Sequence, residues 1–206
     1  MSENLKDTYL TIESSSEGLF KDKGSKFIAY AYPIYSEDEV KPIIEVLKKE
    51  HYSARHHCFA WRLGVDGERF RANDDGEPSG SAGKPILGQL LSKNITNILV
   101  VVVRYFGGTL LGVPGLINAY KNATRDVIDN ANVIEKIVED KVEVTFDYLV
   151  MNDVMKVIKD EDLKQLSSEY DLMCKIVLPV RQQKTKRVVE RLSKIESAIV
   201  EIIGTR

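Results

Sequence analysis

The pattern of apolar and polar residues over the first fifty positions predicts two strands followed by a helix. Residues 8–20 and 25–34 are rich in Tyr, Ile, Phe and Thr, and a short polar turn separates them, which is typical of neighbouring strands. Ser36 and Glu39 have the spacing of a capping box, which often begins a helix. Residues 40–47 then repeat apolar side chains at helical spacing, so we expect a surface helix packed on a sheet.

Residues 55–63 alternate in the manner of a further strand, and a DG turn signal after Gly64 predicts a returning strand. One face would carry His56, Cys58, Ala60 and Arg62, and the other His57, Phe59, Trp61 and Leu63. Adjacent histidines on opposite faces of a regular strand cannot bind one metal ion, which weakens a zinc hypothesis. We expect His57 to be hydrogen-bonded and half-buried, whereas His56 could line a polar surface.

The stretch of residues 74–120 is predicted to contain a glycine-rich loop, a helix, a buried strand, a second glycine-rich loop and a second helix. The strand, residues 97–106, has an unbroken apolar run that indicates burial on both faces. Arg104 ends this run shortly before Gly107 and Gly108, and a cation beside a flexible loop at a strand end is a common setting for a binding site. Pairing of Arg104 with a carboxylate of the first loop is the structural alternative, and the two are compatible.

Three carboxylates crowd the first glycine-rich loop: Asp74, Asp75 and Glu77. As an enzyme site they would bind magnesium or form an acid–base pair, because hard oxygen ligands suit magnesium. The structural alternative is a turn in which Asp accepts hydrogen bonds from backbone amides and Gly supplies positive φ. The sequence favours the turn, and the cation of Lys84 could hold the acidic cluster.

The segment from Gly80 to Lys84 resembles a phosphate-binding loop only superficially. It lacks the spacer and the Lys-Ser/Thr pair of a Walker motif, and Pro85 follows the lysine, which disfavours a nucleoside triphosphatase. Pro85 near the first helical turn still leaves free amides at a helix N-terminus, where an anion is favoured. The second helix is predicted at residues 116–132, after Pro114. The candidate anion-binding or nucleic-acid-binding groups here are His56, Lys84, Arg104, Gly107 and Gly108.

The pattern after residue 138 predicts a compact second domain with the order β-α-β-β-α-β, the split βαβ arrangement. Residues 134–140 are expected to be a polar connection. The expected strands are 141–146, 165–170, 172–178 and 198–203, and the expected helices are 149–159 and 180–193.

The last helix is cationic, with one acid, Glu190, against six basic side chains: Arg181, Lys184, Lys186, Arg187, Arg191 and Lys194. Such a charge run is most often a solvated face, and the alternative is a nucleic-acid surface using Arg181, Lys184 and Arg187. No aromatic pair for base stacking is visible on the expected strands, so only sequence-independent backbone contact is supported.

Composition limits these hypotheses further. The 206 residues contain 29 Lys plus Arg against 31 Asp plus Glu, so any nucleic-acid surface must be a local patch. Cys58 and Cys174 form no CxxC or zinc spacing, which favours reduced structural thiols. The polar N-terminus lacks a signal-peptide pattern, and no segment approaches a membrane span. We expect a cytoplasmic protein with no metal and no cofactor.

Three segments, ARHHCFAW, DDGEPSGSAGKPIL and VVVRYFGGTLLG, occur in an order and spacing that resemble the YigZ/IMPACT family. The match spans about residues 18–132 and continues into a family-like C-terminal domain. The resemblance implies an α+β protein of two domains, expected at residues 1–137 and 138–206. The first would be an α/β sandwich resembling domain IV of elongation factor G and a small-subunit ribosomal protein. The second would be ferredoxin-like, resembling domain V of that factor.

The resemblance also implies a function in translation. Eukaryotic relatives regulate translation through a kinase-activating pathway and bind a ribosome-associated partner, and nucleic-acid binding is proposed for bacterial relatives. The family has no established catalytic residues, so none is carried over. The leading hypothesis is therefore a non-catalytic regulator that binds RNA, the ribosome or a ribosome-bound partner. The alternatives are an enzyme or small-anion binder using the glycine-rich loops with Arg104 and the three carboxylates, and a purely protein-binding module.

Overall fold

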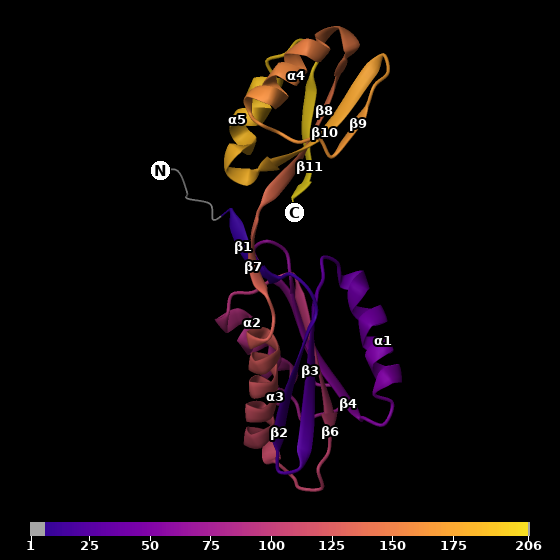
Figure 1. Ribbon diagram of the computed structural model, residues 1–206, viewed down its shortest axis with the longest axis vertical. Coiled ribbons are helices and arrows are strands. Elements are labelled where there is room, and N and C mark those ends of the chain that lie inside the picture. Colours follow the sequence, from indigo (N-terminus) through magenta and orange to yellow (C-terminus); the bar gives the residue numbers. More distant parts are fainter. Residues whose placement is uncertain (1–6, 206) are drawn as a thin grey trace. The chain divides into compact units, whose positions relative to one another are not determined.

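The computed structural model describes residues 7–205 of the chain, and their contacts divide the protein into two compact units (Figure 1). The larger unit contains residues 9–136, and the smaller unit contains residues 137–205 together with Asp7 and Thr8. Helices and antiparallel strands occur in both units, so the chain has the α+β class that the sequence predicts. The domain boundaries at residues 1–137 and 138–206 stay a prediction.

The larger unit is built on a five-stranded antiparallel sheet in the order β2-β3-β6-β4-β5, and a separate sheet pairs β1 with β7. Figure 1 shows α1 on one side of the five-stranded sheet and α2 and α3 on the other. The elements are β1 (Thr8–Ile12), β2 (Ser16–Asp22), β3 (Ser25–Pro33), η1 (Glu37–Glu39), α1 (Val40–Glu50), β4 (His56–Leu63), β5 (Arg69–Asn73), α2 (Gly83–Ser92), β6 (Ile98–Tyr105), α3 (Gly112–Asp129) and β7 (Val133–Ile137).

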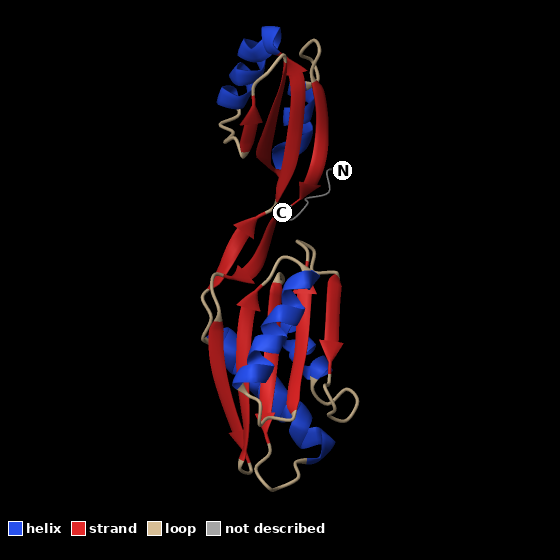
Figure 2. Cartoon of the chain, turned by 90° about the vertical axis from the view of Figure 1, so that its right-hand side faces the viewer, coloured by secondary structure: helices blue, strands red, loops and turns tan. Residues whose placement is uncertain are grey.

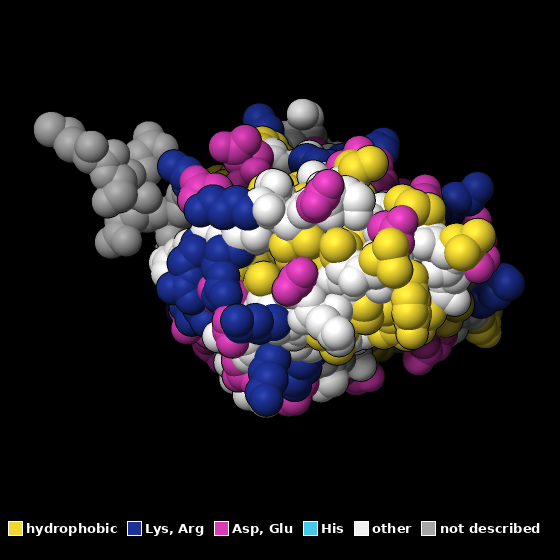
Figure 3. Space-filling view, turned by 90° about the horizontal axis from the view of Figure 1, so that it is seen from above, with side chains coloured by type: hydrophobic (Ala, Val, Ile, Leu, Met, Phe, Trp, Pro, Cys, Tyr) yellow, Lys and Arg dark blue, Asp and Glu magenta, His cyan; other side chains and the backbone are white. Residues whose placement is uncertain are grey.

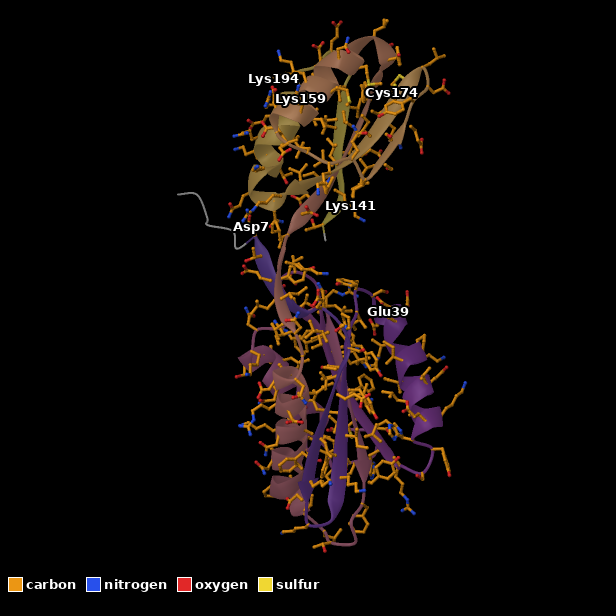
Figure 4. The ribbon with its side chains drawn as sticks, in the orientation of Figure 1. Asp7, Glu39, Lys141, Lys159, Cys174 and Lys194 are labelled. Atoms are coloured by element: carbon orange, nitrogen blue, oxygen red, sulfur yellow. The ribbon has the colours of Figure 1, made fainter. Side chains whose placement is uncertain are left out.

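Separate hydrophobic cores cover the two faces of this sheet. Val100 and Val102 pack in the core with residues of α2 and α3, whereas Val101 and Val103 pack in the core with residues of α1. Strand β6 is buried at every residue except its last, which confirms the prediction of a central strand covered on both faces. The capping box is also confirmed, and Figure 4 shows Glu39 at the start of α1.

Two predicted elements of the larger unit have different bounds. Residues 8–20 were predicted as one strand but belong to β1 and β2, because the chain leaves the strand after Ile12 and the Glu13 amide donates to the Asn132 carbonyl at 3.0 Å. Helix α3 begins at Gly112 rather than at residue 116. Pro114 is tolerated inside its first turn, because the first four amides of a helix have no intrahelical acceptor.

The polar connection predicted at residues 134–140 is wrong, since this segment contains most of β7 and the start of β8 (Glu139–Asp147). Exposed and half-buried residues alternate along β7. The two charged residues of β7, Glu135 and Lys136, are adjacent in sequence and stand among exposed and half-buried apolar residues. Polarity alone therefore did not separate a strand with an open face from a loop here.

The smaller unit has the predicted order β-α-β-β-α-β, in a four-stranded sheet ordered β11-β8-β10-β9. Figure 2 shows its helices and strands. Its core contains Phe146, Cys174 and Val188 among other buried residues. In the described part of the chain, no helix combines the length and apolar character needed to cross a bilayer. The remaining elements are η2 (Tyr148–Val150), α4 (Met151–Asp160), β9 (Ser167–Glu169), β10 (Met173–Arg181), α5 (Gln182–Leu192) and β11 (Ile199–Thr205).

Candidate functional site

The first glycine-rich loop is organised around the carboxylate of Asp74. Its Oδ1 accepts hydrogen bonds from the amides of Ala82 at 3.0 Å and Gly83 at 2.8 Å, and its Oδ2 accepts one from Gly80 at 2.8 Å. These amides lie at the N-terminal end of α2, the place predicted to attract an anion. The anion at the N-terminus of α2 is therefore the carboxylate of Asp74 itself, which caps the helix from a residue outside it.

The pKa of Asp74 reflects two opposing effects. Partial burial acts to raise it, but the hydrogen bonds from the three amides and the charge of Lys84 outweigh burial, so the pKa lies below the ordinary value. Lys84 itself is exposed. Asp74 is thus held as a carboxylate that stabilises the loop, which agrees with the turn interpretation of this acidic cluster.

Glu77 and Arg104 form a buried ion pair beneath this loop. Arg104 Nη1 donates to Glu77 Oε1 at 2.7 Å, and the two side chains are only 8% and 3% exposed. The guanidinium carbon also lies 5.5 Å from the ring centroid of Phe27 and 5.7 Å from that of Phe106, within the range of cation–π contact. The structural alternative for Arg104, pairing with a loop carboxylate, is the arrangement observed.

Tyr120 and Cys58 extend this buried network. The Tyr120 hydroxyl donates to Glu77 Oε1 at 2.8 Å, and Cys58 Sγ lies 3.3 Å from that hydroxyl and 3.0 Å from the Asp74 carbonyl oxygen. Burial is the main cause that raises the pKa of both Tyr120 and Cys58, so neither group ionises readily. The thiol lacks the electropositive, exposed setting of a catalytic nucleophile.

Tyr120 lies within the helix predicted at residues 116–132, but the sequence did not predict its polar contact. A signal was nevertheless present, because a buried tyrosine usually finds a partner for its hydroxyl. Glu77 was considered as a partner for Arg104 but not for Tyr120. The apolar and polar pattern of a helix sequence does not reveal which loop contacts the hydroxyl of a buried tyrosine.

Asp75 connects the loop to the two adjacent histidines of β4. Its Oδ2 accepts a hydrogen bond from the His57 amide at 2.7 Å, and its carbonyl lies 2.9 Å from His56 Nδ1, which donates to it. His57 was expected to be half-buried and hydrogen-bonded, but it is buried and its Nε2 has no hydrogen-bond partner among the described residues. Burial lowers its pKa. His56 is half-buried, and its Nδ1 is already hydrogen-bonded to the loop backbone. Both histidines therefore hold Asp75 in place.

The three carboxylates of the loop have separate partners: backbone amides for Asp74, the histidine strand for Asp75, and Arg104 with Tyr120 for Glu77. Between residues 7 and 205, no group of three or more His, Cys, Asp or Glu side chains is arranged to hold a metal ion. This arrangement favours a structural role for the acidic cluster.

The second glycine-rich loop is fixed to the β2–β3 turn. The Gly107 amide donates to Ser25 Oγ at 3.1 Å, and a Cβ on Gly107 would lie 1.9 Å from the carbonyl carbon of Gly24. Gly107 is therefore required for close backbone approach. Gly108, with φ of +87°, is exposed and has open space around it.

His56 and Arg104 are direct partners on neighbouring strands β4 and β6, so the structure brings these two candidate residues together. Lys84 belongs to α2, and Gly107 and Gly108 follow the end of β6. Arg181, Lys184 and Arg187 belong to the smaller unit. There, Arg181 Nε and Nη2 donate to the two oxygens of Asp7, which Figure 4 shows beside β1.

Acids on or next to α4 neutralise part of the cationic helix α5. Arg187 and Arg191 both donate to Glu161, which is buried, and Arg191 also donates to Asp160 at 2.7 Å. These arginine hydrogen bonds are the main cause that lowers the pKa of Glu161. Within residues 7–205, three exposed lysines on or just after this helix have no carboxylate partner: Lys184, Lys186 and Lys194.

Comparisons with known proteins extend over most of the chain. The family model of the Impact N-terminal domain matches residues 23–128. IMPACT family member YigZ of Escherichia coli is 33% identical over 161 residues, which are 76% of this chain and 79% of the relative. IMPACT family member YvyE of Bacillus subtilis is 28% identical over 195 residues, 95% of this chain and 90% of the relative. A crystal structure of a hypothetical protein superposes with a TM-score of 0.74 at 28% identity, over 97% of this chain and 99% of that chain.

Proposed function

The chain belongs to the IMPACT family, and we propose that it acts in the regulation of translation without catalysis, by binding RNA, the ribosome or a ribosome-bound partner. The family resemblance carried by the three sequence segments supports the connection with translation. We further propose a ferredoxin-like fold for the smaller unit, supported by its sheet order β11-β8-β10-β9, and a likeness of the larger unit to domain IV of elongation factor G.

The observation that carries the binding proposal is a set of three lysines, on or just after α5, that have no carboxylate partner in the part of the chain that the structure describes. Arg187 pairs with Glu161, and Arg191 pairs with both Glu161 and Asp160. By contrast, the exposed lysines have no carboxylate partner in the described residues: Lys184, Lys186 and Lys194. Exposed ammonium groups on and just after one helix can contact phosphates without reading base sequence. The expected ligand is therefore an RNA backbone, free or within the ribosome.

Co-sedimentation with ribosomes at low and high salt tests this proposal, with and without nuclease. We expect association at low salt that weakens as salt rises, because each phosphate contact releases counterions. Replacing Lys184, Lys186 and Lys194 together by Gln should lower the log–log salt slope by about two. The matched control is the triple Gln variant of Lys26, Lys49 and Lys121, which are exposed lysines of the larger unit.

Absence of association at low salt would refute the translation proposal. Equal binding by the α5 variant and the control variant would instead refute α5 as the contact surface. Nuclease resistance of the association would point to a ribosome-bound protein as the partner rather than RNA.

A specific observation favours one alternative, a small-anion site at Arg104. The Arg104 Nε is buried and has no hydrogen-bond partner among the described residues, while Phe106 is exposed beside the guanidinium. His56, Lys84, Gly107 and Gly108 remain candidate members of such a site. Titration of the protein with inorganic phosphate, followed by NMR of the Arg104 side chain, distinguishes the two functions, since only the alternative expects a saturable shift.

A further inference from the structure

The smaller unit carries a pocket of about 750 Å³ where the end of β8 meets the turn before β10. The Tyr148 amide donates to the Leu172 carbonyl at 3.3 Å and joins its two walls. A volume of this size holds two or three bulky side chains or a small ligand. Its lining residues are Asp147, Tyr148, Leu149, Tyr170, Asp171, Leu172 and Met173.

The walls of this pocket are apolar and unusually open to solvent. Leu149 is 89% exposed and Leu172 is 84% exposed, and Tyr148, Tyr170 and Met173 are also exposed. Figure 3 looks onto this end of the smaller unit and shows hydrophobic side chains gathered on one part of the face, with acidic side chains among them. A contiguous exposed apolar surface of this kind marks an interaction site more often than isolated surface leucines do.

The charges at the pocket have one sign. Asp147 Oδ1 accepts a hydrogen bond from the Leu149 amide at 3.0 Å, and Asp171 Oδ1 accepts one from the Leu172 amide at 2.8 Å. Neither Oδ2 atom has a hydrogen bond or ion pair within residues 7–205, and no Lys or Arg lines the pocket. Two uncompensated carboxylates therefore border an apolar floor.

We propose that this pocket is the docking site for a short segment of a partner protein in which bulky apolar residues stand next to Lys or Arg. The apolar side chains would fill the floor and exclude water, and the cations would meet the free oxygens of Asp147 and Asp171. A nucleic acid does not fit, because its phosphates would face two carboxylates. The inference goes beyond RNA binding and does not depend on it, since α5 takes no part.

A dye-labelled peptide, acetyl-Lys-Leu-Trp-Lys-Leu-Phe-Lys-amide, tests the proposal by fluorescence anisotropy with the full chain, and the same peptide with Glu for Lys is its counterpart. We expect saturable binding of the Lys peptide, weakened by salt, and no binding of the Glu peptide. Leu172→Asp should weaken binding by about tenfold or more. The matched control is Leu110→Asp, at a residue of the larger unit that is 83% exposed, and it should bind as the unchanged protein does.

A double variant, Asp147→Asn with Asp171→Asn, isolates the charges, because Asn keeps the side-chain oxygen that accepts the backbone amide. It should bind the Lys peptide several-fold more weakly and lose most of the salt dependence. Equal binding by the Leu172→Asp and Leu110→Asp variants would overturn the site. Equal affinity for the Lys and Glu peptides would overturn the proposed chemistry of the partner and leave a purely apolar ligand.

Discussion

Arg104 Nη1 lies 2.7 Å from Glu77 Oε1, and this buried pair joins the first glycine-rich loop to the end of β6. Glu77 comes from the first glycine-rich loop, Arg104 from the end of β6, and Tyr120 adds a hydroxyl from α3. A buried pair costs desolvation energy to form, but loss of one member leaves a charge with neither water nor a partner. The pair therefore fixes where the loop lies on the sheet.

Glu77→Ala should lower the free energy of unfolding by about 3–5 kcal/mol, because Arg104 would stay buried and uncompensated. Urea unfolding followed by circular dichroism measures this change. The control is Asp129→Ala, which removes the exposed ion pair with Lys93 and should cost no more than about 1 kcal/mol. Equal losses in the two variants would show that the buried pair does not hold the loop.

Asp74→Asn should lower stability most near neutral pH. The pKa of Asp74 is lowered in the folded protein, so its stabilisation is complete above the unfolded value of about 3.9 and is lost as pH falls through the lower folded value. The difference in unfolding free energy between the two proteins should therefore shrink as pH falls from about 6 to about 2.5. A difference that stays constant over this range would contradict the role of the carboxylate charge.

The two cysteines should be inert in the folded protein. Cys58 and Cys174 are free and buried, and burial raises the pKa of Cys58, so little thiolate is available for attack. With a chromogenic disulfide reagent, we expect labelling to be slower than in urea by about a hundredfold or more. Rapid labelling of Cys58 in the native state would show that the loop above it opens readily.

Gly107→Ala and Gly88→Ala should have opposite effects. A Cβ on Gly107 would collide with the Gly24 backbone, whereas a Cβ on Gly88, within α2, meets nothing within 4 Å. We expect Gly107→Ala to destabilise by more than about 1 kcal/mol and Gly88→Ala to stabilise by about 0.5–1 kcal/mol. Thermal unfolding of both variants measures the difference, and destabilisation by both would indicate that helix α2 is more tightly packed than its surface shows.

Periodicity predicted the elements better than it predicted their partners. The run from Ile98 to Val103 indicated a central strand because burial on both faces leaves no polar position. The sequence predicted only that an Asp of the loop could accept hydrogen bonds from backbone amides in a turn. It did not predict which amides Asp74 contacts, because a loop sequence does not fix which groups come close in space. The exposed pocket around Leu149 and Leu172 had no signal, because it depends on the meeting of two turns distant in sequence.

The pairing of Arg181 with Asp7 was likewise beyond the reach of the sequence, because 174 positions separate the two residues. The Val138 amide also donates to the Asp7 carbonyl at 2.7 Å.

The smaller unit is consequently assembled from two pieces of chain, with the whole larger unit inserted between them. During synthesis, the larger unit can be completed and fold before Arg181, the partner of Asp7, has been added to the chain. The order of folding is thus nested rather than sequential, and a fragment that begins at residue 137 would leave Arg181 without the carboxylate that holds it.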